Sequence, residues 1–219
     1  MNLSKVAVVL QGLQNELCHP SGLLHETVRE QLERRNTIDN IVAFLREALA
    51  LDIKCYLVPI SFTPDYRELR APDGVFGIVK KLGAFKRGTF GVELVDKVKP
   101  LLPSINVLGP KRGMCAFGST DLDERLRQDG VDTIVACGLL TNICIESTAR
   151  TANDFGYKVV VLNDCTACQM AEAQEASERF VFPLVSKVMK FREFLSQIRD
   201  EQEPVHATSR HDASIERAH

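Results

Sequence analysis

Residues 132–150 read DTIVACGLLTNICIESTAR. The stretch joins a short, β-branched apolar run to a longer segment with helical spacing, and Gly138 lies at the turn between them. A buried strand that runs into a helix in this way is the repeating unit of a parallel sheet covered by helices. The stretch therefore predicts an α/β fold, and it places Cys144 where the helix begins.

The same alternation recurs along the chain and predicts a three-layer α/β/α domain with a six-stranded, mostly parallel sheet of Rossmann type. We expect strands at residues 5–11, 53–61, 104–108, 132–137, 157–162 and 184–189. We expect helices at residues 31–51, 121–128, 142–155 and 172–182, with a short helix near 75–82. The domain is expected to span residues 1–200, and the polar residues 201–219 are expected to form a disordered tail.

Residues 59–89 interrupt the alternation because they are rich in proline and glycine. Long excursions of this kind in compact domains serve as lids, binding loops or subunit contacts. One of these roles is expected here.

Composition excludes several classes of function. The chain has 219 residues, of which 45% are hydrophobic and 26% charged, and its net charge is −2, so no positive field attracts nucleic acid or an anionic membrane. No apolar run approaches the roughly 18 to 20 residues of a membrane span, and the N-terminus shows no signal peptide. Seven cysteines, an odd number set mostly in apolar surroundings, suit a reducing compartment better than a disulfide framework. We expect a cytoplasmic protein that binds neither nucleic acid nor membrane.

The sequence contains few candidate ligands for a metal ion and no motif for a nucleotide. Only His19 and His25 lie within the expected domain, and the pair Cys165 and Cys168 supplies half of a tetrahedral zinc site. The glycines do not assemble into either standard phosphate loop. The expected protein has no metal and no cofactor.

Two reactive side chains follow strands whose carboxyl ends share one edge of the predicted sheet. Lys111 leaves the third strand, and Cys144 follows the fourth. A thiol at a helix N-terminus meets the positive end of the helix dipole, which favours the thiolate, and a nearby ammonium favours it further. A buried structural thiol and a solvated loop lysine are the alternative interpretations.

Two segments that carry these residues resemble the isochorismatase-like cysteine hydrolases. They are KRGMCAFGSTDL (residues 111–122) and GLLTNICIESTAR (residues 138–150), and the resemblance extends over residues 5–195. The segment GTFGVEL (residues 88–94) and the loop at residues 64–66 are similar to the branch of the family that hydrolyses N-carbamoyl compounds and other amides.

The resemblance implies a catalytic triad of aspartate, lysine and cysteine that forms an acyl-enzyme, and Lys111 and Cys144 take two of the three places. It also implies a cis peptide bond between Leu140 and Thr141, which would aim backbone N–H groups of Leu140, Thr141 and Cys144 at an oxyanion. Dimers or tetramers are common in the family, so a homodimer or homotetramer is expected. The family's metal-containing amidases have histidines after the second strand, and this chain has none there. Further pocket candidates are Gln14, Glu16, His19, Phe117, Asn142 and Asp164.

The aspartate of the triad is missing. The segment QGLQNEL (residues 11–17) aligns Gly12 with it, and the neighbouring Gln11 is expected to point to the opposite face of the strand. Loss of a general base costs roughly 100- to 10,000-fold in rate. We therefore expect Gly12→Asp to create or raise activity, with some loss of stability.

Three interpretations follow. In the first, which we favour, Cys144 and Lys111 hydrolyse a small amide, carbamoyl or related C–N compound through a thioacyl-enzyme, and Glu16, Asp164 or the substrate transfers the proton. In the second, the domain is a catalytically weak or inactive binding or assembly module. In the third, the thiol serves redox sensing or adduct formation.

Overall fold

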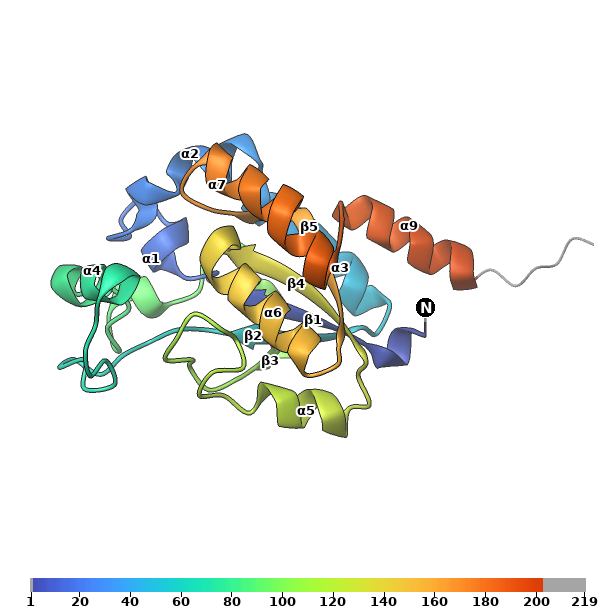
Figure 1. Ribbon diagram of the computed structural model, residues 1–219, viewed down its shortest axis with the longest axis horizontal. Coiled ribbons are helices and arrows are strands. Elements are labelled where there is room, and N and C mark those ends of the chain that lie inside the picture. The colour runs from blue at the N-terminus through green and yellow to red at the C-terminus, as the bar shows by residue number, and fades with distance from the viewer. Residues whose placement is uncertain (1, 203–219) are drawn as a thin grey trace, which may run out of the picture.

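Six parallel strands form one sheet in the order β3-β2-β1-β4-β5-β6 (Figure 1). The computed structural model describes residues 2–202; residue 1 and residues 203–219, which include most of the expected tail, lie outside the described part. The strands are β1 (Val6–Gln11), β2 (Lys54–Val58), β3 (Asn106–Val107), β4 (Thr133–Leu139), β5 (Lys158–Ala167) and β6 (Lys187–Met189).

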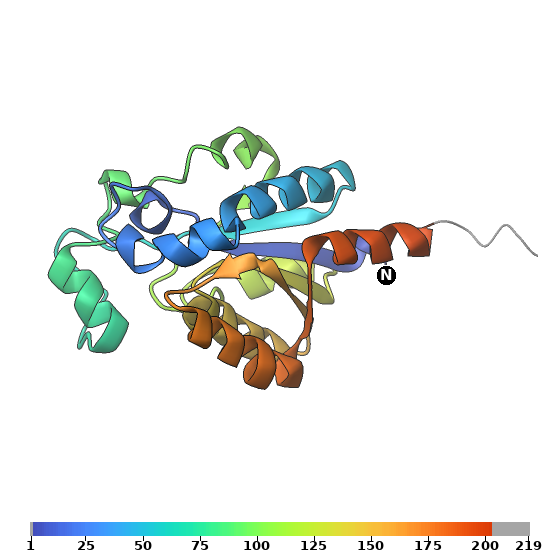
Figure 2. The same ribbon diagram turned by 90° about the horizontal axis from the view of Figure 1, so that it is seen from above.

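Helices cover both faces of the sheet (Figure 2). The α-helices are α1 (Asn15–Cys18), α2 (Arg29–Arg34), α3 (Thr37–Ala50), α4 (Gly74–Leu82), α5 (Leu122–Gln128), α6 (Glu146–Asp154), α7 (Ala171–Ala176), α8 (Phe182–Val185) and α9 (Phe191–Gln202). Shorter helical turns are η1 (Leu3–Lys5), η2 (His25–Thr27), η3 (Phe90–Val92), η4 (Lys99–Ser104), η5 (Thr141–Ile145) and η6 (Ser177–Val181). The expected three-layer α/β/α architecture is confirmed, and every strand pairing is parallel.

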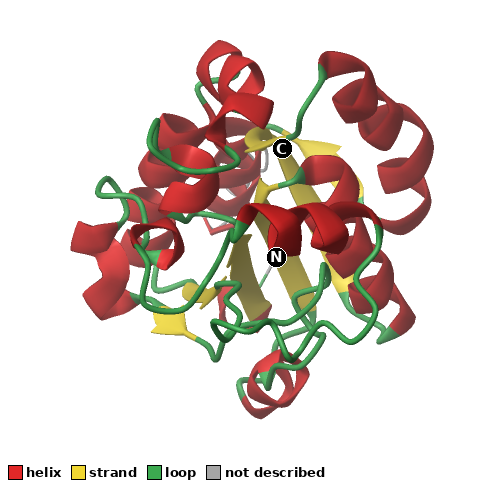
Figure 3. Cartoon of the chain, turned by 90° about the vertical axis from the view of Figure 1, so that its left-hand side faces the viewer, coloured by secondary structure: helices red, strands yellow, loops and turns green. Residues whose placement is uncertain are grey.

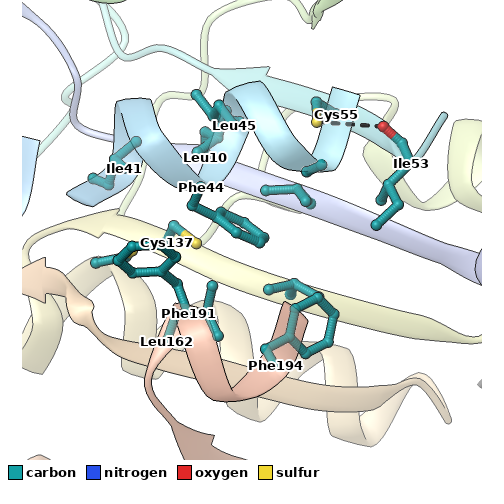
Figure 4. Packing of buried hydrophobic residues seen from close by; sticks show 14 of the residues in the cluster. Leu10, Ile41, Phe44, Leu45, Ile53, Cys55, Cys137, Leu162, Phe191 and Phe194 are labelled. Carbon is teal, nitrogen blue, oxygen red and sulfur yellow. Dashed lines mark hydrogen bonds between the residues drawn. The ribbon is translucent and has the colours of Figure 1, made fainter. Parts of the chain in front are cut away.

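Strand β1 is buried on both faces, as a central parallel strand requires. Its alternate residues Leu10 and Val8 belong to the cluster under α3 and α9, whereas Val9 belongs to the cluster under α5 and α6. Figure 4 shows the first cluster, in which the Phe44 ring of α3 lies 6.0 Å from the Phe194 ring of α9. This packing fixes β1 at the centre of the molecule.

Several predicted boundaries are wrong for local reasons. The helix expected at residues 31–51 is two helices, because Asn36 adopts a left-handed conformation (φ 51°) between α2 and α3. Strand β2 ends before Pro59, which has no N–H for the sheet. The segment expected as a strand from residue 184 begins with α8, and β6 starts at Lys187.

The other predicted elements differ in length or in continuity. Strand β3 keeps two residues, and β5 continues to Ala167. The helix expected at residues 142–155 begins with the wider turn η5 before α6, and the helix expected at 172–182 is divided into α7, η6 and α8. The excursion at 59–89 contains α4, close to the short helix expected there, whereas α9 was not predicted.

The order in which successive strands are added to the sheet reverses at β1. Strand β1 lies between β2 and β4, so the connections that leave these strands run to opposite sides, and a crevice forms beyond their carboxyl ends. Helices α1 and α4 lie at this end of the molecule (Figure 1), which faces the viewer in Figure 3. A third apolar cluster, which includes Ile60, Val79 and Leu140, packs here. Within residues 2–202, no helix is long and apolar enough to cross a membrane.

Candidate active site

A cavity of about 60 Å³ lies beyond the carboxyl ends of β1 and β4. Helix α4 forms part of its wall through Val75, Phe76 and Val79, and Ile60 and Leu139 add to the apolar lining. The cavity is large enough for ordered water or a small ligand group. The excursion at 59–89 thus contributes a wall of this cavity, which is consistent with a binding loop, one of the three roles expected for it.

Two titratable side chains, Lys111 and Cys144, are among the residues that line this cavity. Lys111 follows β3, and Cys144 lies in η5 after β4, so the folding of two distant segments brings them together. Both are residues that the sequence predicts for catalysis.

The local geometry of η5 places Cys144 in the first turn of a helix. The Leu140 carbonyl accepts hydrogen bonds from the N–H groups of Cys144 at 2.9 Å and Ile145 at 3.1 Å, and η5 then continues as α6. The thiol therefore meets the positive end of the helix dipole. Cys144 is a free, partly exposed cysteine.

Lys111 is held in the interior by its backbone and by its side chain. Its N–H donates to the Pro59 carbonyl at 2.8 Å, which extends the sheet alongside Ile60. The side chain is buried, with 1% of the residue exposed, and Nζ donates to the Met114 carbonyl and to Oε1 of Gln11, the latter at 2.7 Å. No carboxylate within 4.0 Å of Nζ is found in the described part of the chain.

Gln11, the last residue of β1, is the site residue that sequence reasoning missed. Its Nε2 donates to Thr148 Oγ1 at 2.9 Å, and Thr148 Oγ1 also accepts the Ala116 N–H at 2.8 Å. The Gln11 side chain points toward α6 and Lys111. The signal was present in the strand alternation, since Val9 faces α6 and Gln11 lies two residues further on.

Gly12 lines the cavity, but the space beside it does not accept a side chain. Its φ is +69°, a left-handed conformation that favours glycine, and an added Cβ would lie 2.4 Å from the Leu139 carbonyl oxygen. An aspartate here requires the β1 and β4 ends to move apart, which supports the expected loss of stability in Gly12→Asp. The expected rise in activity stays a prediction.

Gln14 and Glu16 do not line the cavity, and their side chains bind backbone groups around it. Gln14 Nε2 donates to the carbonyls of Ile60 and Val92, and its Oε1 accepts the Ile60 N–H at 2.8 Å. The two carboxylate oxygens of buried Glu16 accept the N–H groups of Leu23 and Phe85, both at 2.9 Å. Both carboxylate oxygens of Glu16 thus form hydrogen bonds with the backbone around the cavity.

His19, Phe117 and Asp164 are also outside the cavity lining. The His19 ring packs edge-on against Phe90, with centroids 4.8 Å apart, and the Phe117 ring stacks on Tyr157 on the α5 side. Asp164 Oδ1 accepts the Phe191 N–H at 2.9 Å, which anchors the start of α9.

Asn142 follows Thr141 in η5 but does not line the cavity. Its Oδ1 is buried and has no hydrogen-bond partner among residues 2–202.

The predicted cis peptide bond and oxyanion donors need correction. The cis bond joins Leu139 and Leu140, one position before the predicted one. The Leu140 carbonyl accepts the hydrogen bonds that start η5. The Cys144 N–H donates to that carbonyl and is not free for an oxyanion. Thr141 is buried, and its Oγ1 donates to Gln174 Oε1 at 2.6 Å. Leu140 itself lines the cavity.

Four of the other cysteines, Cys55, Cys137, Cys165 and Cys168, are buried. Burial raises the pKa of Cys18 to about 12 and the pKa of Cys55 to about 12, and it also raises the pKa of Cys165. Cys168 Sγ contacts the Met170 carbonyl at 3.3 Å. Over residues 2–202, no group of three or more His, Cys, Asp or Glu side chains is arranged to hold a metal ion.

Comparison with known proteins identifies the family of this chain. Residues 6–193 match the isochorismatase domain. The isochorismatase family protein YwoC of Bacillus subtilis is 46% identical over 89 residues, which are 41% of this chain and 47% of YwoC. The ureidoacrylate amidohydrolase RutB of Azorhizobium caulinodans is 27% identical over 213 residues, which are 90% of this chain and 92% of RutB. The chain spans about half the length of YwoC and of similar relatives from Escherichia coli and Bacillus subtilis.

Solved structures share the fold. A cysteine hydrolase from Pseudomonas syringae superposes with a TM-score of 0.78 at 24% identity, covering 91% of this chain and 95% of that one. N-carbamoylsarcosine amidase from Thermoplasma acidophilum superposes with a TM-score of 0.65 at 24% identity, covering 85% and 96%. Since the domain match extends from the first strand into the last helix and the superpositions reproduce the fold, this chain belongs to the isochorismatase family.

Proposed function

We propose that this chain is a cysteine-dependent hydrolase of small amide, carbamoyl or related C–N compounds, with a thioacyl-enzyme intermediate on Cys144. The observation that carries the proposal is that Cys144, at the start of a helix, and the buried ammonium of Lys111 line one small apolar cavity. Relatives named as a ureidoacrylate amidohydrolase and a nicotinamidase support an amide-type substrate.

The proton transfers are assigned to Lys111. Glu16 and Asp164 do not line the cavity, and both accept backbone N–H groups. In the lining formed by residues 2–202, Lys111 is the remaining titratable group beside Cys144. An ammonium that gives up its proton and recovers it satisfies both halves of the reaction without a carboxylate.

The proposed reaction has two steps, acylation of Cys144 and hydrolysis of the thioester. The thiolate of Cys144 forms a bond to the carbonyl carbon, and the ammonium of Lys111 gives a proton to the nitrogen as the C–N bond breaks. The neutral amine of Lys111 next takes a proton from the water that attacks the thioester. The C–S bond breaks with the electron pair returning to sulfur, which restores the thiolate and the ammonium.

Ammonia release from a panel of small primary amides and carbamoyl compounds tests the proposal. Wild-type protein is expected to release ammonia, and Cys144→Ala is expected to lose at least about a thousandfold in rate, because the nucleophile is gone. Cys115→Ala is the matched control, since Cys115 is also partly exposed but does not line the cavity. Release that persists in Cys144→Ala contradicts the assignment.

One observation favours a second candidate function. Among residues 2–202, no carboxylate lines the cavity, so no described residue there can serve as the carboxylate base of the family's triad. A catalytically weak or inactive binding or assembly module follows from that absence. This alternative predicts no ammonia release from any panel member and the same ligand binding in wild type and Cys144→Ala.

A further inference from the structure

We infer that Gln11 is a positioning residue that holds Lys111 in place without neutralising it, so that the cavity keeps an uncompensated positive charge facing Cys144. The inference rests on the proposed function in one respect, because it takes Cys144 as the group that reacts in this cavity.

The hydrogen bonds around Gln11 fix its role. Oε1 accepts from Lys111 Nζ at 2.7 Å, and Nε2 donates to Thr148 Oγ1 at 2.9 Å. Gln11, Lys111 and Thr148 are all buried, and the Ala116 N–H at 2.8 Å fixes the threonine in turn. A side chain bonded at both ends in the interior has one orientation, so the position of the ammonium is fixed as well.

Within residues 2–202, the two acceptors of Lys111 Nζ are neutral, namely the Gln11 amide and the Met114 carbonyl, so the charge of Lys111 has no counterion there. Two acidic side chains near this end of the sheet, Glu16 and Glu68, bind groups other than Lys111. Glu16 accepts two backbone N–H groups, and Glu68 lies 3.6 Å from Arg112. A buried ammonium with neutral partners acts strongly on a nearby anion, because apolar walls screen charge poorly.

This arrangement has a chemical consequence for the cavity. A carboxylate in the place of Gln11 would form an ion pair with Lys111 and remove most of its effect on neighbouring groups. The neutral amide leaves that effect available to the thiolate of Cys144, to a developing oxyanion and to an approaching anionic reagent. The Gln11 amide thus determines the electrostatic potential at the sulfur atom.

Alkylation of Cys144 by two reagents of nearly equal size measures this potential. Iodoacetate is an anion and iodoacetamide is neutral, so the ratio of their rate constants reports the local charge, whereas a purely structural change moves both rates together. The ratio for Cys144, followed on its own peptide, is expected to exceed the ratio for N-acetylcysteine amide, a thiol that carries no other charge. In Gln11→Glu, it is expected to fall about tenfold.

The side chain of Gln11→Glu has nearly the same size, and the Thr148 hydroxyl can donate to its second oxygen while still accepting from Ala116. Gln128→Glu is the matched control, because it adds the same charge on the exposed face of α5. Lys111→Met removes the charge itself and is expected to lower the ratio at least as far as Gln11→Glu does, which keeps the test valid if Gln11→Glu does not fold.

Equal ratios in wild type, Gln11→Glu and Lys111→Met would overturn the inference. The assay needs no turnover, so its result is separate from that of the ammonia assay. Ammonia release that depends on Cys144, together with an unchanged ratio, would remove this inference alone. An altered ratio without ammonia release would remove the hydrolase proposal alone.

Discussion

At the scale of single residues, two neighbours at the end of β1 account for the unusual features of the site. Gln11 meets Lys111 through an amide, and Gly12 packs against the Leu139 backbone. The second feature is a steric constraint, because the left-handed φ and the close carbonyl both require glycine.

Gly12→Ala is therefore expected to lower the free energy of unfolding by about 2 to 4 kcal/mol, the sum of backbone strain and overpacking. Urea unfolding measures the change. Gly130→Ala is the control, because Gly130 has nearly the same φ, +68°, with nothing within 4 Å of its added Cβ. Its cost is expected to be near 1 kcal/mol, the strain contribution alone. Equal losses in the two variants would show that the contact with Leu139 is unimportant.

At the scale of elements, the sequence predicts those parts whose causes are local. The apolar runs of β1 and β4 and the helix that begins near Cys144 follow from periodicity, and the structure has them. The contact between Gln11 and Lys111 joins residues 100 positions apart and depends on how β1 and β3 lie in the sheet. Likewise, the crowding of Gly12 depends on the approach of β4. Tertiary packing decides both the Gln11–Lys111 contact and the crowding of Gly12. The sequence pattern alone therefore predicts Cys144 and Lys111 as candidate site residues but not the residues that they contact.

Helix α4 forms one wall of the cavity and is expected to set the size of the acyl group that fits. Phe76 lines the cavity and packs edge-on against Phe62, with centroids 6.0 Å apart. Phe76→Ala is expected to raise the kcat/KM for p-nitrophenyl butyrate relative to the acetate by about tenfold, because the enlarged space accepts the longer chain. Ile78→Ala on the same helix is the control, since Ile78 is 54% exposed and does not line the cavity. The same preference in wild type and Phe76→Ala would contradict the placement of α4 at the substrate.

At the scale of the whole molecule, one carboxylate ties the sheet to the helical layer. Asp129, at the end of α5, accepts the Tyr56 hydroxyl and pairs with Lys54, both from β2. The hydrogen bond from Lys54 and that from Tyr56 hold the pKa of Asp129 below its usual value. Because the folded pKa is lower than the unfolded one, the stabilisation is present above about pH 4 and is lost as the pH falls through the folded pKa.

Asp129→Asn is therefore expected to lower the free energy of unfolding by about 1 kcal/mol at pH 7, and the difference from wild type is expected to shrink toward pH 2. Urea unfolding across this pH range measures it. Asp154→Asn, at an exposed aspartate with no ion pair recorded in residues 2–202, is expected to change little at any pH. A difference for Asp129→Asn that stays constant with pH would rule out this carboxylate as the source.

The most direct test of a Cys144 and Lys111 pair that functions without a carboxylate is acetylation by p-nitrophenyl acetate, followed by rapid quenching and peptide mass mapping. Because p-nitrophenolate leaves without a proton, the rate of acylation depends on the Cys144 thiol and not on proton transfer from Lys111. The rate of deacylation then reports the contribution of Lys111. The account predicts a transient acetyl group on Cys144 in wild type, none at that position in Cys144→Ala, and deacylation slowed at least about 100-fold in Lys111→Met. Acetylation spread over the other cysteines, or equal deacylation in wild type and Lys111→Met, would contradict it.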